Sequence, residues 1–268
     1  MPPISRRRFF FHSAHTTIGV SAGLAALASH GGLVEPEWAD AAEESTDRPV
    51  RLCLVSGSLE YRSDESLSAF QEHLEKGHPT VKCSRAFMRT QSDLPGLENL
   101  DQSDCMLLFT RRLTISGEPL ERVKRYCARG GPIVAVRTAS HAFENWLALD
   151  KEVLGGDYRG HYGEKLKPKV SLVAGSESHP VLRGVSPFTS AGSLYENPKL
   201  AGDVTRLLEG TIPEHTEPVA WVRPHRGGRV FYTSLGHPDD FRQPSFLRLL
   251  VNAIFWTTLS PARSGATS

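Results

Sequence analysis

Residues 105–110 read Cys-Met-Leu-Leu-Phe-Thr and contain no charged side chain. An apolar run of this length is typical of a β-strand that is covered on both faces, as the strands of parallel sheets are. Two further runs are almost as apolar: Val50–Ser56, which ends at Gly57, and Pro132–Val136. The three runs therefore predict a parallel sheet with helices on both sides.

Helical periodicity separates these runs. Residues Glu65–Lys76 carry apolar side chains at helical spacing, and Ser63 and Asp64 before them can cap a helix. Val81–Met88 alternates as a strand does, and Glu118–Arg129 has helical spacing again. The resulting order, β-α-β-β-α-β, predicts an α/β fold with three layers and a mostly parallel central sheet.

The second half of the chain is less regular but continues the same domain. Its expected strands and helix are Lys169–Ala174, Val204–Leu208, a hairpin of Val219–Arg223 and Arg229–Ser234 joined through Pro224–Gly228, and a closing helix at Pro244–Thr257. No internal repeat and no linker of domain length is present in the sequence. We therefore expect one domain over residues 50–258, followed by a flexible tail at 259–268.

Composition excludes several classes of protein. The 268 residues hold 31 Lys and Arg against 30 Asp and Glu, which gives a formal net charge of +1. Such a balance is typical of a globular protein and lacks the basic face that nucleic-acid binding requires. Four cysteines, none in a C-x-x-C pair, do not fit a zinc ribbon or a thioredoxin-like site.

The first 41 residues have the pattern of an export signal. Ser5–Phe10 is basic and holds a pair of arginines followed by x-Phe, Thr17–Ala28 is apolar, and Ala39–Ala41 matches an A-x-A cleavage site. The apolar stretch is shorter than the ~20 residues that span a bilayer, so we expect no stable membrane anchor. The pattern predicts a twin-arginine signal, with a general secretory signal as the alternative, followed by a linker at 42–49 and a periplasmic or extracellular protein.

Polar residues follow the predicted strands, where parallel α/β sheets bind their ligands. Glu60 and Tyr61 follow the first strand, Arg111 and Arg112 the third, and His237 follows the strand of the hairpin. The turn after Val136, which holds Arg137, Thr138, Ser140 and His141, has the position of a nucleophile elbow. The elbow has no Cys, which argues against a Cys-dependent glutaminase, and Ser140 beside His141 is not a G-x-S-x-G arrangement.

Five stretches resemble the trehalose-utilisation, or ThuA-like, family. They are Gly228–His237 running into Pro244–Trp256, Gly155–His161, Ser178–Gly184, Leu194-Tyr195-Glu196 and Gly131–Phe143. The resemblance covers residues 50–258 and implies a flavodoxin-like fold related to class I glutamine amidotransferases. It also implies a link to disaccharide metabolism, trehalose above all. Many such proteins carry His at the elbow, whereas Arg137 takes that position here and His141 follows four residues later.

These observations suggest histidine acid–base chemistry on a sugar or oxidised sugar. His161 and His237 would exchange protons, with Glu60 as a further base. Tyr61 could stack on a sugar, and Arg137 could orient the ligand or stabilise an oxyanion. Arg111, Thr138, His141 and Tyr195 complete the expected substrate-binding set.

Each candidate also has a structural explanation. His161 could brace its loop, His237 could cap the turn to Pro238, and Tyr61 could pack its own loop. Arg111, Arg112 and Arg137 could pair with Asp64, Glu65 or Glu144, and we favour this for Arg112. Asp239 and Asp240 precede the last helix, where capping is favoured, and His179 before Pro180 is expected to be structural.

The sequence thus predicts an exported protein that binds a small carbohydrate as a hydrolase, lyase or isomerase. The alternative is a non-catalytic module of the same fold that binds a sugar or a protein. His141, His161, His237 and Glu60 could hold a metal, but their spacing is unlike H-E-x-x-H, and we expect no metal or other cofactor. The oligomeric state is left open.

Overall fold

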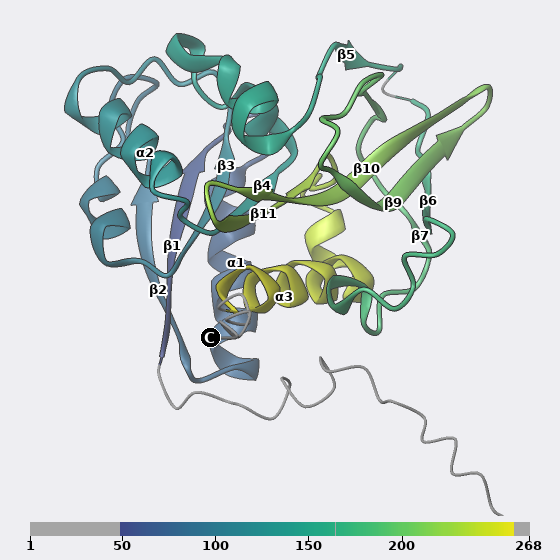
Figure 1. The fold of residues 1–268 in the computed structure, drawn as a ribbon, viewed down its shortest axis with the longest axis horizontal. Coiled ribbons are helices and arrows are strands. Elements are labelled where there is room, and N and C mark those ends of the chain that lie inside the picture. The colour runs from purple at the N-terminus through teal and green to yellow at the C-terminus, as the bar shows by residue number, and fades with distance from the viewer. Residues whose placement is uncertain (1–48, 164, 260–268) are drawn as a thin grey trace, which may run out of the picture. The chain divides into compact units, whose positions relative to one another are not determined.

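The computed structural model describes residues 49–163 and 165–259. In this part of the chain the main element is a nine-stranded sheet with the order β2-β1-β3-β4-β11-β10-β9-β6-β7 (Figure 1). The five parallel strands are β2 (Val81–Phe87), β1 (Val50–Gly57), β3 (Cys105–Thr110), β4 (Ile133–Val136) and β11 (Gly228–Thr233). The antiparallel strands are β10 (His215–His225), β9 (Thr205–Ile212), β6 (Lys169–Leu172) and β7 (Phe188–Thr189). The predicted mixed α/β domain with a mostly parallel sheet is confirmed.

Helices cover both faces of this sheet. Helices α1 (Ser63–Gly77) and α3 (Pro244–Thr258) pack on one face and α2 (Glu118–Ala128) on the other (Figure 1). Successive residues of β1 enter opposite cores: Leu52 packs with α1 and α3, whereas Cys53 packs with α2. This alternation follows from the two-residue period of a strand. It explains why the central strands are apolar throughout.

The predicted cap of α1 is wrong. The helix begins at Ser63, and the residue before it, Arg62, has a left-handed backbone with φ of 43° and makes no side-chain cap. The Ser63 hydroxyl instead accepts a hydrogen bond from the Ser58 backbone N–H at 2.8 Å and pairs with the Ser56 hydroxyl at 2.7 Å. Ser63 therefore ties the start of α1 to the end of β1, which local capping rules do not foresee.

The predicted hairpin is confirmed, and its first strand is longer than expected. Strand β10 runs to His225 and β11 starts at Gly228, so that Arg226 and Gly227 form a two-residue turn. Both residues have positive φ, 51° and 83°, as such turns require. The predicted strand Val204–Leu208 likewise extends to Ile212 as β9.

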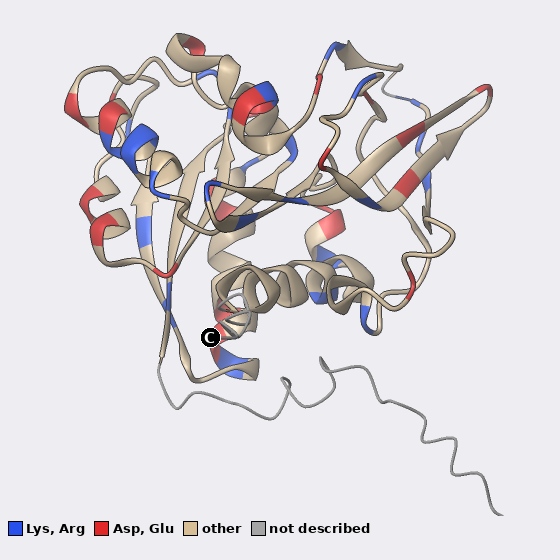
Figure 2. Ribbon diagram, viewed as in Figure 1, with Lys and Arg blue, Asp and Glu red and all other residues tan. Residues whose placement is uncertain are grey.

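A second, two-stranded sheet lies beside the main one. In it β5 (Gly160–His161) pairs with β8 (Tyr195–Glu196), and His161 stands opposite Tyr195. Charged residues of both signs are spread over the described elements (Figure 2). Within residues 49–163 and 165–259, no helix combines the length and the apolar character that a membrane crossing needs. The predicted signal peptide at 1–41, most of the linker and the tail from 260 onward lie outside the described residues.

Candidate functional site

The loops that follow the parallel strands meet at one edge of the sheet. Tyr61 follows β1, Arg137 follows β4 and His237 follows β11. The Tyr61 ring lies 4.5 Å from the Arg137 guanidinium carbon and 6.4 Å from the His237 ring centroid. Three loops that are distant in sequence thus form one cluster, where the rule for parallel α/β sheets places a ligand.

The turn after β4 has the tight backbone of an elbow. Arg137 has a left-handed φ of 47° and begins the short helix Arg137–His141. Its carbonyl accepts a hydrogen bond from the Tyr232 hydroxyl at 2.8 Å. Arg62 and Arg112, which follow β1 and β3, share positive φ values of 43° and 47°. A non-glycine residue in this region is uncommon and marks a backbone that its surroundings hold in place.

The Arg137 side chain lies inside the protein. It is 1% exposed, and its guanidinium carbon lies 4.5 Å from the ring of Tyr61 and 4.6 Å from the ring of Tyr195. Both distances are within the range of cation–π attraction. We call these three side chains, Tyr61, Arg137 and Tyr195, the arginine stack.

Four N–H groups of Arg137 are used within the protein. Nη1 donates to the carbonyls of Ser234 at 2.7 Å and Ser193 at 3.4 Å. Nη2 donates to the hydroxyls of Tyr61 at 3.1 Å and Ser193 at 3.2 Å. The Nε atom is buried and has no partner within the described residues. Arg137 could therefore act on a ligand only through the tyrosines that flank it. The sequence had suggested a guanidinium exposed on the rim of the site.

The His141 ring also lies near Tyr195, with ring centroids 6.3 Å apart. Its ring stacks on Tyr158 with centroids 4.6 Å apart, and its Nδ1 lies 3.0 Å from the Ser140 hydroxyl. Side chains of sequence neighbours do not normally point at one another, so the sequence did not indicate this pair. No carboxylate among the described residues hydrogen-bonds to the His141 ring, so the pair lacks the third member of a catalytic triad. Burial, together with the charges of Arg112, Arg111 and Arg137, lowers the pKa of His141 to about 3.

This low pKa makes stability depend on pH. The unfolded chain takes up a proton at His141 near pH 6.5, whereas the folded protein does so only near pH 3. The unfolded state therefore binds more protons in this window, and stability is lost as the pH falls from 6.5 toward 3. At pH 4.5 the neutral His141 should cost about 2–3 kcal/mol of unfolding free energy relative to pH 7.5.

Urea unfolding at pH 7.5 and 4.5 tests this expectation. His141→Gln should lose about 2–3 kcal/mol less than the wild type between the two pH values. His73→Gln, which alters an exposed histidine of α1, should lose as much as the wild type. Equal losses in all three proteins would refute a buried neutral His141.

His161 and His237 contact different tyrosines of the arginine stack. The His161 ring centroid lies 6.4 Å from that of Tyr195, and the His237 centroid lies 6.4 Å from that of Tyr61. His161 is exposed, whereas the side chain of His237 is 33% exposed. Burial, as the largest influence, lowers the pKa of His237, which favours a neutral imidazole at pH 7.

Asp240 fixes the loop that carries His237. Its carboxylate is fully buried and accepts hydrogen bonds from the backbone N–H groups of Gly236 at 3.0 Å and His237 at 3.1 Å. It also accepts from the Ser190 hydroxyl and the Ala191 N–H, both at 2.8 Å. We expected Asp240 to cap the last helix, but it joins two loops instead. His179 has the expected structural role, because its Nδ1 accepts from the Val181 N–H at 3.2 Å.

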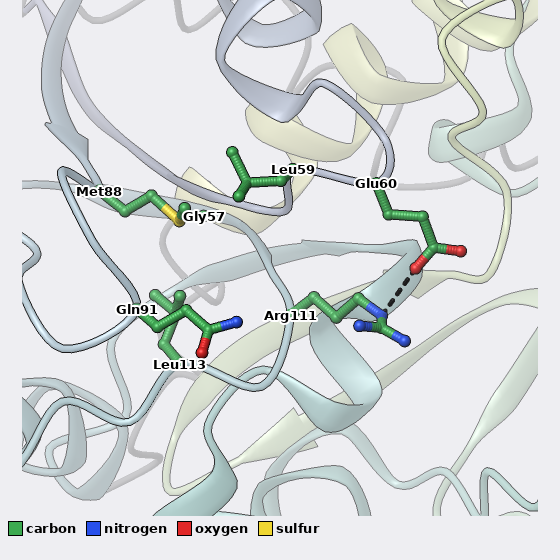
Figure 3. A pocket seen from close by; sticks show the side chains of 7 residues that line it. All are labelled: Gly57, Leu59, Glu60, Met88, Gln91, Arg111 and Leu113. Atoms are coloured by element: carbon green, nitrogen blue, oxygen red, sulfur yellow. Dashed lines mark ion pairs between the residues drawn. The ribbon is translucent and has the colours of Figure 1, made fainter.

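Glu60 lies in an ion pair beside a small pocket. Its carboxylate is 2.8 Å from Arg111 Nε, and the pocket between them and Leu59, Met88 and Gln91 holds about 50 Å³ (Figure 3). A water molecule needs roughly 10–15 Å³ on this measure, so the pocket has room for a few waters and not for a disaccharide.

Two other predicted site residues, Arg112 and Thr138, are explained by an ion pair and by burial. Arg112 pairs with Glu144 at 2.8 Å, as the structural explanation foresaw. Thr138 is fully buried, and its hydroxyl has no partner within the described residues.

The structure also adds residues that the sequence interpretation missed. Tyr158 packs on Tyr195 with ring centroids 4.6 Å apart, and Ser193 binds the Arg137 guanidinium. Tyr158 belongs to Gly155–His161, one of the stretches that resemble the ThuA-like family, and this resemblance could have pointed to it. Nothing in the sequence marked Ser193 or distinguished Asp240 from Asp239.

Within the described residues, neither a reactive thiol nor a cluster of metal ligands is found at the edge of the sheet that carries the site. Burial raises the pKa of Cys53 to about 11 and those of Cys83, Cys105 and Cys127 to about 12, so these thiols are protonated at neutral pH. In the part of the chain that the structure describes, no three His, Cys, Asp or Glu side chains gather as metal ligands. His141, His161, His237 and Glu60 therefore do not assemble there as a metal site.

Comparison with known proteins places this arrangement in context. Residues 51–257 match the family model described as "ThuA: Trehalose utilisation". A putative ThuA-like protein from Bacteroides uniformis is 20% identical, with a TM-score of 0.61, over 79% of this chain and 93% of that one. A second, from Parabacteroides merdae, is 15% identical, with a TM-score of 0.59, over 81% of this chain and 93% of that one. A search of curated proteins gave no match.

Proposed function

Because the chain belongs to the ThuA, or trehalose-utilisation, family, we propose that it acts on a carbohydrate by histidine acid–base chemistry. The observation that carries this proposal is the arginine stack, with His161 beside one of its tyrosines and His237 beside the other. Tyrosine rings suit the apolar faces of sugars, and imidazoles exchange protons near neutral pH.

Backbone contacts give the two histidines opposite roles. Nδ1 of His161 lies 3.0 Å from the Tyr162 carbonyl, which can only accept, so this nitrogen carries the proton and Nε2 is free to take one. Nδ1 of His237 accepts from the Asp239 N–H at 3.2 Å, so its Nε2 carries the proton. In the proposed reaction His161 is the base, and His237 donates a proton or a hydrogen bond.

The test is proton NMR of the purified protein with trehalose, glucosides and their 3-keto derivatives. We expect product from the wild type, loss of at least 100-fold in rate for His161→Ala and for His237→Ala, and an unchanged rate for His73→Ala. Imidazole ¹⁵N shifts of the free protein should show the Nδ1–H form of His161 and the Nε2–H form of His237.

The alternative is a sugar- or protein-binding module without catalysis, and the ion pair that engages the Glu60 carboxylate, a predicted base, favours it. Saturable binding of a sugar with no chemical change in the NMR spectrum would select this alternative. Turnover that survives both histidine substitutions would contradict the assigned roles while leaving a carbohydrate enzyme.

We also propose that residues 1–41 direct export to the periplasm. The support is the arginine pair Arg6-Arg7, the apolar stretch Thr17–Ala28 and the Ala39–Ala41 match. Exchange of Arg6 and Arg7 for Lys should keep the uncleaved chain in the cytoplasm, as seen by fractionation and immunoblot. Unchanged export would indicate the general secretory route instead.

A further inference from the structure

Three tyrosines gather around the buried guanidinium. Tyr61 and Tyr195 flank Arg137, and Tyr158 packs between Tyr195 and His141, with its ring centroid 4.6 Å from each. All three rings come from different segments of the chain. Two phenol rings face the buried cation and a third packs on one of them, which is more than cation–π attraction alone requires.

The hydroxyl groups of these tyrosines are not used up inside the protein. The Tyr61 hydroxyl accepts from Arg137, which leaves its own proton to donate. Within the described residues, the hydroxyls of Tyr158 and Tyr195 make no hydrogen bond and are not among the buried polar atoms that lack a partner. Tyr195 is only 2% exposed, so that its small exposed fraction includes the hydroxyl. Each of these two hydroxyls therefore keeps a small exposed surface and a proton that it can donate to a ligand.

The arginine stack carries the positive charge of Arg137, whereas the nearby Arg111 and Arg112 are paired with Glu60 and Glu144. The charges that act on the neighbouring His141 are those of Arg111, Arg112 and Arg137. Asp240 is the carboxylate that acts on Arg137, but it accepts its hydrogen bonds from the loops at 190–191 and 236–237 and none from the guanidinium. A negatively charged ligand oxygen would be stabilised here, because a charge-assisted hydrogen bond is about twice as strong as a neutral one.

We propose that the hydroxyls of Tyr61, Tyr158 and Tyr195, backed by Arg137, form a binding site for a sugar carboxylate. This inference rests on the proposed function in taking the ligand to be a sugar, and it adds that the sugar is an acid of the uronate class. Arg137 acts through Tyr61, whose hydroxyl becomes a stronger donor by accepting the guanidinium hydrogen bond.

Calorimetric titration of the full-length protein with D-glucuronate and with D-glucuronamide tests the site, because the two differ in charge and hardly in shape. We expect glucuronate to bind at least about tenfold more tightly. Tyr195→Phe and Tyr158→Phe, which keep the rings, should each reduce this ratio severalfold. Tyr162→Phe removes a hydroxyl bound to Glu217 outside the stack, and the ratio should not change.

The outcomes separate this inference from the proposed function. A high ratio without turnover of trehalose, glucosides or their 3-keto derivatives supports the carboxylate site and rejects the proposed chemistry on these neutral sugars. Equal binding of acid and amide, or no binding of either, overturns the carboxylate site, whatever the turnover of trehalose. Neither Arg nor Tyr side chains ordinarily titrate between pH 6 and 8.5, so the ratio of glucuronate to glucuronamide affinity should stay constant over that range. A steep fall of this ratio with rising pH would assign recognition of the carboxylate to a protonated histidine instead. Near-ultraviolet circular dichroism verifies that each variant is folded.

Discussion

Arg137→Ala should lower the unfolding free energy by about 3–5 kcal/mol. The change leaves the carbonyls of Ser193 and Ser234 without their donor inside the protein and empties the space between Tyr61 and Tyr195. An unsatisfied buried acceptor costs about 1–3 kcal/mol, and the cavity adds to this. Urea unfolding at pH 7.5 measures the loss.

Arg62→Ala is the matched control for this variant. Arg62 has nearly the same positive φ, 43° against 47°, but its side chain is exposed and forms an ion pair with Glu65. Its replacement should change stability by no more than about 0.5 kcal/mol. Equal losses from the two substitutions would show that backbone conformation, and not the stack, causes the effect.

Asp240→Ala should also cost about 3–5 kcal/mol. The buried carboxylate serves the N–H groups of Ala191, Gly236 and His237, and an alanine leaves all three without an acceptor. Because two of them belong to the His237 loop, the variant should also lose ligand binding under conditions where it is still folded. Urea unfolding and sugar titration measure the two effects.

The neighbouring residue offers the control for Asp240. The Asp239 side chain is 52% exposed, forms an ion pair with Arg242 and lies 3.6 Å from His237 Nδ1. Exposed ion pairs contribute little, so Asp239→Ala should remain within about 0.5 kcal/mol of the wild type. A loss as large as that of Asp240→Ala would mean that charge near the last helix matters more than the buried hydrogen bonds.

The fold could be predicted because its signals are local. The strands β1, β3 and β4 are short apolar runs, and the helices between them have clear periodicity. Strands β9 and β10 were underestimated, because they carry Thr, Glu and His on an exposed face. Their length comes from pairing with each other, which no single stretch of sequence reveals.

The candidate site was predictable only in part, for the same reason. The rule that ligands lie at strand ends singled out Tyr61, Arg137 and His237, which do meet. The burial of Arg137 depends on Ser193 and Ser234, which are 56 and 97 residues away in sequence. Only the tertiary structure brings these carbonyls to the guanidinium, so a charged residue in a loop was taken for a surface group.

The space occupied by Arg137 has a consequence for comparing relatives. A methyl group on Gly192 would lie 2.7 Å from Arg137 Nη1, closer than packed atoms tolerate. Positions 137 and 192 are therefore constrained as a pair: a chain that keeps the arginine must keep the glycine, and a chain with a smaller residue at the elbow is free to enlarge the other. Substitutions that occur together at positions 137 and 192 would therefore distinguish ThuA-like proteins with the arginine stack from those with other residues at the carboxyl ends of the strands.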